Sequence, residues 1–171
     1  MNQDHATSTT TPQLGRYKID TGRSTVTFRT RHLLGLAPVR GRLAIRGGTV
    51  DIAEPLAASA VHAEIDAASF HTRSPQRDAS VRSARLLDAA RYPVITFVSD
   101  RVDDTELAGL LTVRGVTRPI TLSTEPLAVS PRSFTVRATT RLDRTEFGVT
   151  AYPGLAGRYL DMSLEVRCVR K

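Results

Sequence analysis

The segment from Glu106 to Thr124 alternates apolar and other side chains with a period of two residues, broken at Gly115. Such alternation, interrupted by a glycine, predicts an antiparallel β-hairpin with one apolar face. Pro119 has no N–H to donate, so we expect it at a strand start, a bulge or an edge. The residues on the predicted apolar side are Leu107, Gly109, Leu111, Val113, Ile120, Leu122 and Thr124.

The same alternation recurs along most of the chain. Besides the hairpin, it predicts strands over residues 15–20, 24–32, 39–46, 49–52, 59–67, 94–99, 133–142 and 160–169. Gly47 and Gly48 are expected to form a turn between two of these strands. The sequence therefore predicts an all-β protein of about eight antiparallel strands. Such strands either stack as two sheets or close into a barrel, and the pattern alone leaves both arrangements open.

One segment departs from the β pattern. Ser74 is suited to cap a helix and Pro75 to occupy its first position. This predicts a short helical insert from about residue 75 to about residue 90. Val81, Leu86 and Leu87 are the only large apolar residues there, so the helix lacks a wide apolar stripe and should lie on the surface or cap an opening.

The length of 171 residues suits one domain, expected over residues 15–171, preceded by a polar tail (1–14) expected to be disordered. No apolar run is long enough for a transmembrane helix, and the N-terminus lacks the basic start and apolar core of a secretory signal. We therefore expect a cytoplasmic protein. The single cysteine, Cys168, excludes an internal disulfide and is expected to be a small buried core residue.

Six segments, in order from about residue 15 to 169, resemble the YceI-like family of lipid- or polyisoprenoid-binding proteins. They are Tyr17–Asp20 with Ser24–Phe28, Arg31–Leu33 with Val39–Gly41, Ala67–Thr72 with Arg77–Asp78, Tyr92–Ser99, Gly109–Leu122 and Asp143–Gly148. The chain departs from the family pattern at Ser80, where the family usually has a histidine. Arg85 to Asp88 likewise replace its usual acidic-aromatic continuation.

The resemblance implies an extended, lipocalin-like antiparallel barrel, capped by a helix and holding a polyisoprenoid chain in an apolar tunnel. Isoprenoid quinones and prenyl pyrophosphates are the implied ligands, and a homodimer is an implied assembly. The bound lipid would then be the only cofactor-like group. Strand alternation gives the inward residues, which would either line this tunnel or fill a core. They are Val26, Phe28, Leu43, Ile45, Val61, Ile65, Ile95, Phe97, Leu107, Leu111, Ile120, Leu122, Phe134, Val136, Met162, Leu164 and Val166.

Four polar residues are candidates for the tunnel mouth or a lipid head group: His32, Arg77, Arg82 and Arg85. The planar arginine fork suits pyrophosphate well. The neighbouring pairs Arg77–Asp78 and Arg144–Glu146 are interpreted as structural ion pairs, because an adjacent arginine keeps a carboxylate ionised and unsuited to general acid catalysis.

Three other functions, namely a metal site, nucleic-acid binding and catalysis on a small apolar substrate, have weaker support in the sequence than lipid binding. His62 and Glu64 share one strand face, but no third ligand has a spacing that suits a metal site. The net charge of +7 suggests anionic partners, including nucleic acid, yet there are only nine aromatic residues for base stacking and several face inward. An enzyme acting on a small apolar substrate would need an inward polar cluster, and the pattern shows none. The sequence therefore favours a non-catalytic binding protein, with no nucleic-acid partner expected.

Overall fold

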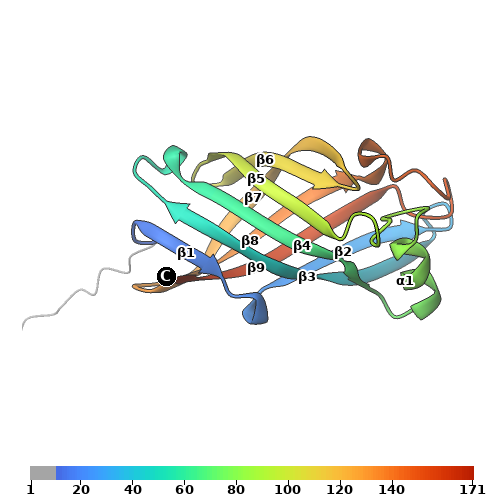
Figure 1. Cartoon of the computed structure of the whole chain (residues 1–171), viewed down its shortest axis with the longest axis horizontal. Helices are drawn as coiled ribbons and strands as arrows, with labels where there is room; N and C mark the ends of the chain where they lie inside the picture. The colour runs from blue at the N-terminus through green and yellow to red at the C-terminus, as the bar shows by residue number, and fades with distance from the viewer. Residues whose placement is uncertain (1–10) are drawn as a thin grey trace, which may run out of the picture.

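The computed structural model describes residues 11–171, so most of the expected N-terminal tail lies outside the described residues. It contains nine strands and one α-helix, joined by short turns and 3₁₀ helices (Figure 1). The strands are β1 (Gly15–Ile19), β2 (Thr25–His32), β3 (Ala37–Ile52), β4 (Ala60–His71), β5 (Val94–Val102), β6 (Glu106–Val113), β7 (Val116–Ser130), β8 (Ser133–Asp143) and β9 (Tyr159–Arg170). The helix is α1 (Pro75–Arg82), and the 3₁₀ helices are η1 (Thr21–Arg23), η2 (Leu56–Ala58) and η3 (Arg144–Phe147).

The sheet closes into an antiparallel barrel, which confirms the predicted all-β class and the closed alternative. Strands β2 to β9 form a ring in which β3 pairs with β4 and β2 pairs with β9. Strand β1 pairs with both β3 and β9 at one end, and β2 occupies the same position between them at the other end. The two strands therefore share one of eight positions, and the closed ring leaves no long unpaired edge.

The predicted turn at Gly47 and Gly48 is wrong. Strand β3 runs without interruption through both glycines, with an irregular register against β4 between Ile45 and Gly47. A Cβ atom at Gly48 would lie 2.5 Å from the carbonyl oxygen of His62 and 2.6 Å from Ile19 Cδ1. The glycine is needed because β3 and β4 approach closely at this point, not because the chain reverses.

The hairpin β6–β7 is confirmed, and its second strand continues to Ser130 to pair with β8. Pro119 lies opposite Leu110 of β6, in a part of β7 before its pairing with β8 begins at Ser123. It therefore occupies a locally unpaired side of the strand, as expected for a residue without an N–H. The helix is shorter than predicted and ends at Arg82, so Leu86 and Leu87 lie in the turns that follow.

Two groups of buried side chains pack along the barrel. One surrounds Phe97, Leu122 and Phe147 towards the end that carries α1, and the other surrounds Tyr17 and Phe134 towards β1. Cys168 belongs to the second group and is 2% exposed, which confirms it as a buried core residue. Within residues 11–171 we find no helix with the length and hydrophobicity needed to cross a membrane.

Candidate functional site

The barrel interior contains two cavities that lie end to end. The first, which we call the helix-end cavity, lies beside α1, is partly open and has a volume of about 550 Å³. The second, the far-end cavity, lies towards β1 and has a volume of about 290 Å³. Ligand pockets commonly span about 300–1,000 Å³. The two cavities adjoin each other and share four lining residues, namely Ile65, Leu111, Leu142 and Met162.

All the residues predicted to face inward line one cavity or both. The helix-end cavity is lined by Phe28, Leu43, Ile65, Ile95, Leu111 and Met162. The far-end cavity is lined by Val26, Ile45, Val61, Ile65, Phe97, Leu107, Leu111, Ile120, Leu122, Phe134, Val136, Met162, Leu164 and Val166. The inward side chains therefore leave open space inside the barrel and do not fill it completely. Contact of these residues with a ligand stays a prediction.

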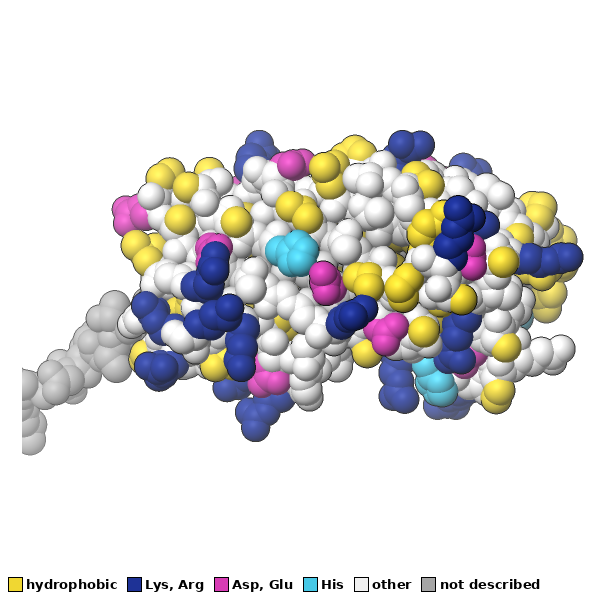
Figure 2. Space-filling view, viewed as in Figure 1, with side chains coloured by type: hydrophobic (Ala, Val, Ile, Leu, Met, Phe, Trp, Pro, Cys, Tyr) yellow, Lys and Arg dark blue, Asp and Glu magenta, His cyan; other side chains and the backbone are white. Residues whose placement is uncertain are grey.

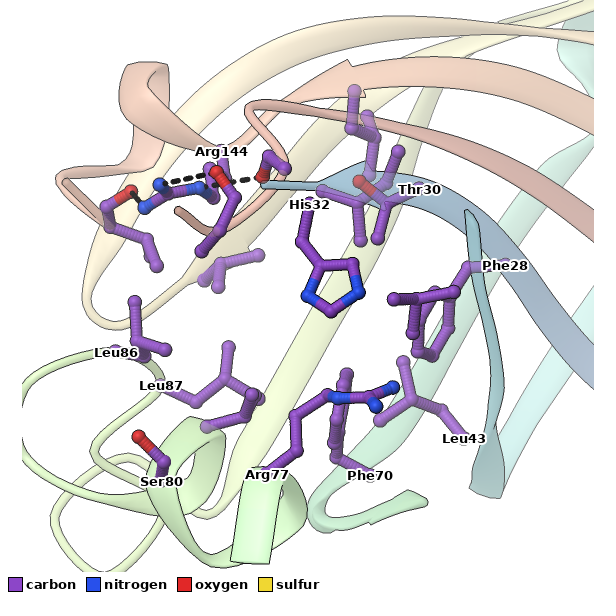
Figure 3. A pocket seen from close by; sticks show the side chains of 18 of the residues that line it. Phe28, Thr30, His32, Leu43, Phe70, Arg77, Ser80, Leu86, Leu87 and Arg144 are labelled. Atoms are coloured by element: carbon purple, nitrogen blue, oxygen red, sulfur yellow. Dashed lines mark hydrogen bonds between the residues drawn. The ribbon is translucent and has the colours of Figure 1, made fainter. Parts of the chain in front are cut away.

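Two of the four polar residues proposed for the mouth reach the helix-end cavity. His32 enters from the end of β2 and Arg77 from α1, and Figure 3 shows their side chains projecting into the same space. Arg82 and Arg85 do not line it. The Arg82 guanidinium instead donates to the carbonyl oxygen of Phe70, and Arg85 lies 5.9 Å from the centre of the Tyr152 ring.

The position of α1, and hence of Arg77, depends on a buried carboxylate. Asp78 is 3% exposed and accepts hydrogen bonds from the backbone N–H and the hydroxyl of Thr72, at 2.9 and 2.7 Å. Burial favours a raised pKa for Asp78, but the bonds from Thr72, with the charges of His71 and Arg82, outweigh it and lower the pKa. The expected Arg77–Asp78 ion pair is therefore wrong, since Asp78 anchors the helix to the end of β4.

Ser80 also lines the helix-end cavity, at the position where the family usually has a histidine. Tyr152, from the loop between β8 and β9, lines the same cavity. Hydrogen bonding with Ser80 and with Arg85 lowers the pKa of the Tyr152 hydroxyl. Ser80 and Tyr152 thus line the same cavity from α1 and from the loop between β8 and β9.

Sequence reasoning missed the contribution of the loop formed by residues 144–158. Arg144 lines the helix-end cavity and donates to the carbonyl oxygens of Gly157 (2.8 Å), Val149 (2.7 Å) and Ala156 (3.3 Å). Burial lowers the pKa of its guanidinium. The expected Arg144–Glu146 ion pair is wrong, because the arginine holds the loop by its backbone. The family-like turn Asp143–Gly148 was the signal that the sequence offered here, and it did not indicate this role.

Further lining residues were also missed because they lie outside the alternating strands or near their ends. They are Phe70, Leu86, Leu87, Leu142, Phe147, Val149, Tyr152, Leu155 and Leu160. The polar groups at the helix end contradict the expectation that the inner face has no polar cluster. They include His32, Gln76, Arg77, Ser80 and Arg144.

The charges at the two ends of the interior differ in sign. Among residues 11–171, the lining of the helix-end cavity includes two arginines, Arg77 and Arg144, and no acidic residue. Within the same described residues, the lining of the far-end cavity includes Asp103, Asp104 and Glu106 and no basic residue. An anionic group entering the barrel is therefore favoured at the helix end.

Two alternatives find little support in the side chains of residues 11–171. The five phenylalanines are all buried, so none of them offers an exposed platform for nucleic-acid bases. His62 and Glu64 belong to no group of three or more metal-ligating side chains in this part of the chain.

Comparison with known sequences gives the family. The YceI-like domain matches residues 17–168, which is nearly all of the described chain. The chain belongs to the YceI-like family. The resemblance found in its strand motifs is thereby confirmed.

Curated relatives and solved structures agree with this family and fold. A UPF0312 protein of Vibrio cholerae is 32% identical over 169 residues, covering 91% of this chain and 87% of the relative. A UPF0312 protein of an Enterobacter species is 32% identical over 170 residues, covering 91% of this chain and 86% of the relative. Burkholderia cenocepacia BcnA superposes with a TM-score of 0.74 at 19% identity, covering 87% of this chain and 98% of BcnA. A polyisoprenoid-binding domain of Saccharophagus degradans, implicated in plant cell wall breakdown, superposes with a TM-score of 0.74 at 15% identity. The match covers 93% of this chain and 100% of that domain.

Proposed function

We propose that this YceI-like protein is a non-catalytic carrier that binds an amphiphilic lipid with an isoprenoid chain inside its barrel. The observation that carries this proposal is a pair of adjoining, mostly apolar cavities inside the barrel, with arginines among the described lining residues of the helix-end cavity alone. An isoprenoid quinone or a prenyl pyrophosphate would place its tail along the barrel and its head group at the helix end. The polyisoprenoid-binding description of the Saccharophagus neighbour supports the same class of ligand.

The length of the barrel suits a long chain. Strand β9 has twelve residues, which span about 40 Å at about 3.3 Å per residue. A tilt of about 40° reduces this to about 30 Å along the barrel axis. Each buried methylene contributes about 0.8 kcal/mol, so the tail would supply most of the affinity. Arg77 and His32 would then set the orientation of the head group.

The test is mass spectrometry of an organic extract of the purified protein, with native mass spectrometry of the intact protein. We expect a stoichiometric apolar adduct, or uptake of one added polyprenyl lipid by the ligand-free protein. A pyrophosphate head group should improve binding over the matching alcohol, and Arg77→Gln should remove that improvement. A protein that is empty and takes up neither lipid would contradict the proposal.

A further inference from the structure

The loops at the helix end expose hydrophobic side chains. Among the described residues, five of nine exposed large hydrophobic side chains lie in the β2–β3 loop, in the β8–β9 loop or at the start of β9. Their exposed fractions are 49% for Leu33, 83% for Leu34, 83% for Leu36, 57% for Leu155 and 44% for Tyr159. Figure 2 shows hydrophobic side chains gathered at this end of the molecule, beside basic ones. We call the four leucines the leucine rim, and such a concentration marks an interaction surface.

The leucine rim is held in place by contacts between its two loops. The backbone N–H of Leu33 donates to the carbonyl oxygen of Leu155 over 2.9 Å, and that of Leu34 donates to Gly154 over 2.7 Å. Leu33 and Leu34 have φ angles of 53° and 58°, a left-handed conformation that is uncommon for residues other than glycine. The two loops therefore form one unit that directs leucine side chains to solvent, where packing in the core does not explain them.

A basic surface groove adjoins the leucine rim. Its lining includes Leu34 and five arginines, and Asp161 is the one acidic residue that the described chain contributes to it. In the described part of the chain, no carboxylate lies within ion-pair distance of Arg29, Arg31 or Arg40, whereas Arg141 and Arg158 have acidic neighbours. We call this feature the arginine groove, and its five arginines are Arg29, Arg31, Arg40, Arg141 and Arg158.

The arginine groove also adjoins the interior of the barrel. It shares Thr30, Val39, Ala156 and Gly157 with the helix-end cavity. Tyr159 lies between two of its arginines, with the guanidinium carbons of Arg141 and Arg158 at 4.6 and 5.2 Å from the ring centre. Tyrosine is suited to the boundary between head groups and acyl chains.

We propose that this end of the barrel docks on an anionic lipid membrane. The leucine rim would enter the acyl region, and the arginine groove would contact the phosphate head groups. Apolar side chains combined with basic residues are what binds a protein to an anionic membrane surface. A second copy of the chain fits less well, because a two-fold contact would place one arginine groove near the other. The docking surface stands whichever ligand the barrel holds, and only direct lipid transfer through it rests on the proposed function.

The experiment is flotation of the purified full chain with phosphatidylcholine vesicles, with and without phosphatidylglycerol. We expect binding only to the anionic vesicles, weaker at high salt. Leu34→Ser with Leu36→Ser should reduce binding about tenfold or more. The matched control is Leu110→Ser with Leu127→Ser, two leucines exposed on the barrel wall, which should bind as the wild type does.

A second pair of variants tests the basic groove. Arg31→Gln with Arg40→Gln should weaken binding to anionic vesicles about fivefold for each arginine removed. Arg23→Gln with Arg46→Gln removes the same charge from exposed positions outside the groove and should have a smaller effect. Urea unfolding of each variant checks that the barrel is intact.

The proposal is overturned if the wild type binds neither kind of vesicle, or if the leucine-rim variant binds as tightly as the wild type. Sedimentation gives one further outcome. A dimer that the leucine-rim variant abolishes, without any vesicle binding, would assign the surface to a second copy and overturn membrane docking. Lipid uptake, followed by native mass spectrometry in the same variants, tests the barrel separately. An empty barrel with intact vesicle binding would contradict only the proposed function.

Discussion

The Asp78 carboxylate accepts two hydrogen bonds from Thr72, and the two residues join the first turn of α1 to the end of β4. Both side chains are buried, with 3% of each residue exposed. Asp78→Ala would leave the N–H and hydroxyl of Thr72 without this acceptor, so we expect a loss of about 2–3 kcal/mol in the free energy of unfolding. Urea denaturation measures this loss. Asp100→Ala, at an exposed position, is the control, and equal stability of both variants would contradict the anchoring role.

Stability should fall in acid as two carboxylates become protonated. Hydrogen bonds from Arg158 and Thr145 lower the pKa of Asp143 to about 2, and the pKa of Asp78 is also lowered. A carboxyl group whose pKa is lower in the folded protein than in the unfolded chain stabilises the fold at pH values above its unfolded pKa of about 4. This contribution is lost as the pH falls towards about 2. The urea concentration at the midpoint of unfolding should therefore decrease as the pH is lowered through this range. Asp143→Asn should make the dependence of the urea midpoint on pH less steep, and an unchanged dependence in this variant would contradict the role of Asp143.

Neighbouring glycines in β3 should respond differently to alanine. Gly48→Ala would place a methyl group against the His62 carbonyl and Ile19, and should destabilise the fold by about 1–3 kcal/mol. Nothing lies within 4 Å of the corresponding position at Gly47, so Gly47→Ala should be neutral or stabilise by up to about 1 kcal/mol. Thermal unfolding compares the two. Equal destabilisation by Gly47→Ala and Gly48→Ala would contradict the difference in space around the two glycines in β3.

A bulky residue where the cavities join should shorten the ligand that fits. Leu142 lines both cavities, so Leu142→Trp should block a ligand chain that extends from one cavity into the other. We expect binding of long polyprenyl chains to weaken at least about tenfold, with short chains affected less. Titration of the ligand-free protein with lipids of graded length measures this. Leu127→Trp on the outer wall is the control, and equal losses for all lengths would indicate a distorted barrel instead of an obstructed one.

The thiol of Cys168 should be unreactive in the folded protein. Burial raises the pKa of this thiol to about 12, so almost no thiolate is present at neutral pH. Iodoacetamide should label the protein only after unfolding in urea, as followed by intact-protein mass. Rapid labelling of the folded protein at neutral pH would contradict the buried position.

The alternating sequence determined which side chains face the barrel interior. A β-strand places successive side chains on opposite faces, so the period of two in Leu107–Val113 and in Leu160–Cys168 assigned the inner face without long-range information. The local signals at Ser74 and Pro75 likewise gave the start of α1, because the N-cap and the first helical position depend on neighbouring residues.

Other features depend on contacts between residues far apart in the chain, so they became visible in the folded structure and not in the sequence. Gly48 lies inside a strand because β4 approaches it closely, whereas a glycine pair by itself favours a turn. Arg144 holds the carbonyl groups of a loop and Asp78 bonds to Thr72, although each charged side chain has an oppositely charged neighbour in sequence. Burial and the geometry of these distant partners chose the contacts, and neither is recorded in the local pattern.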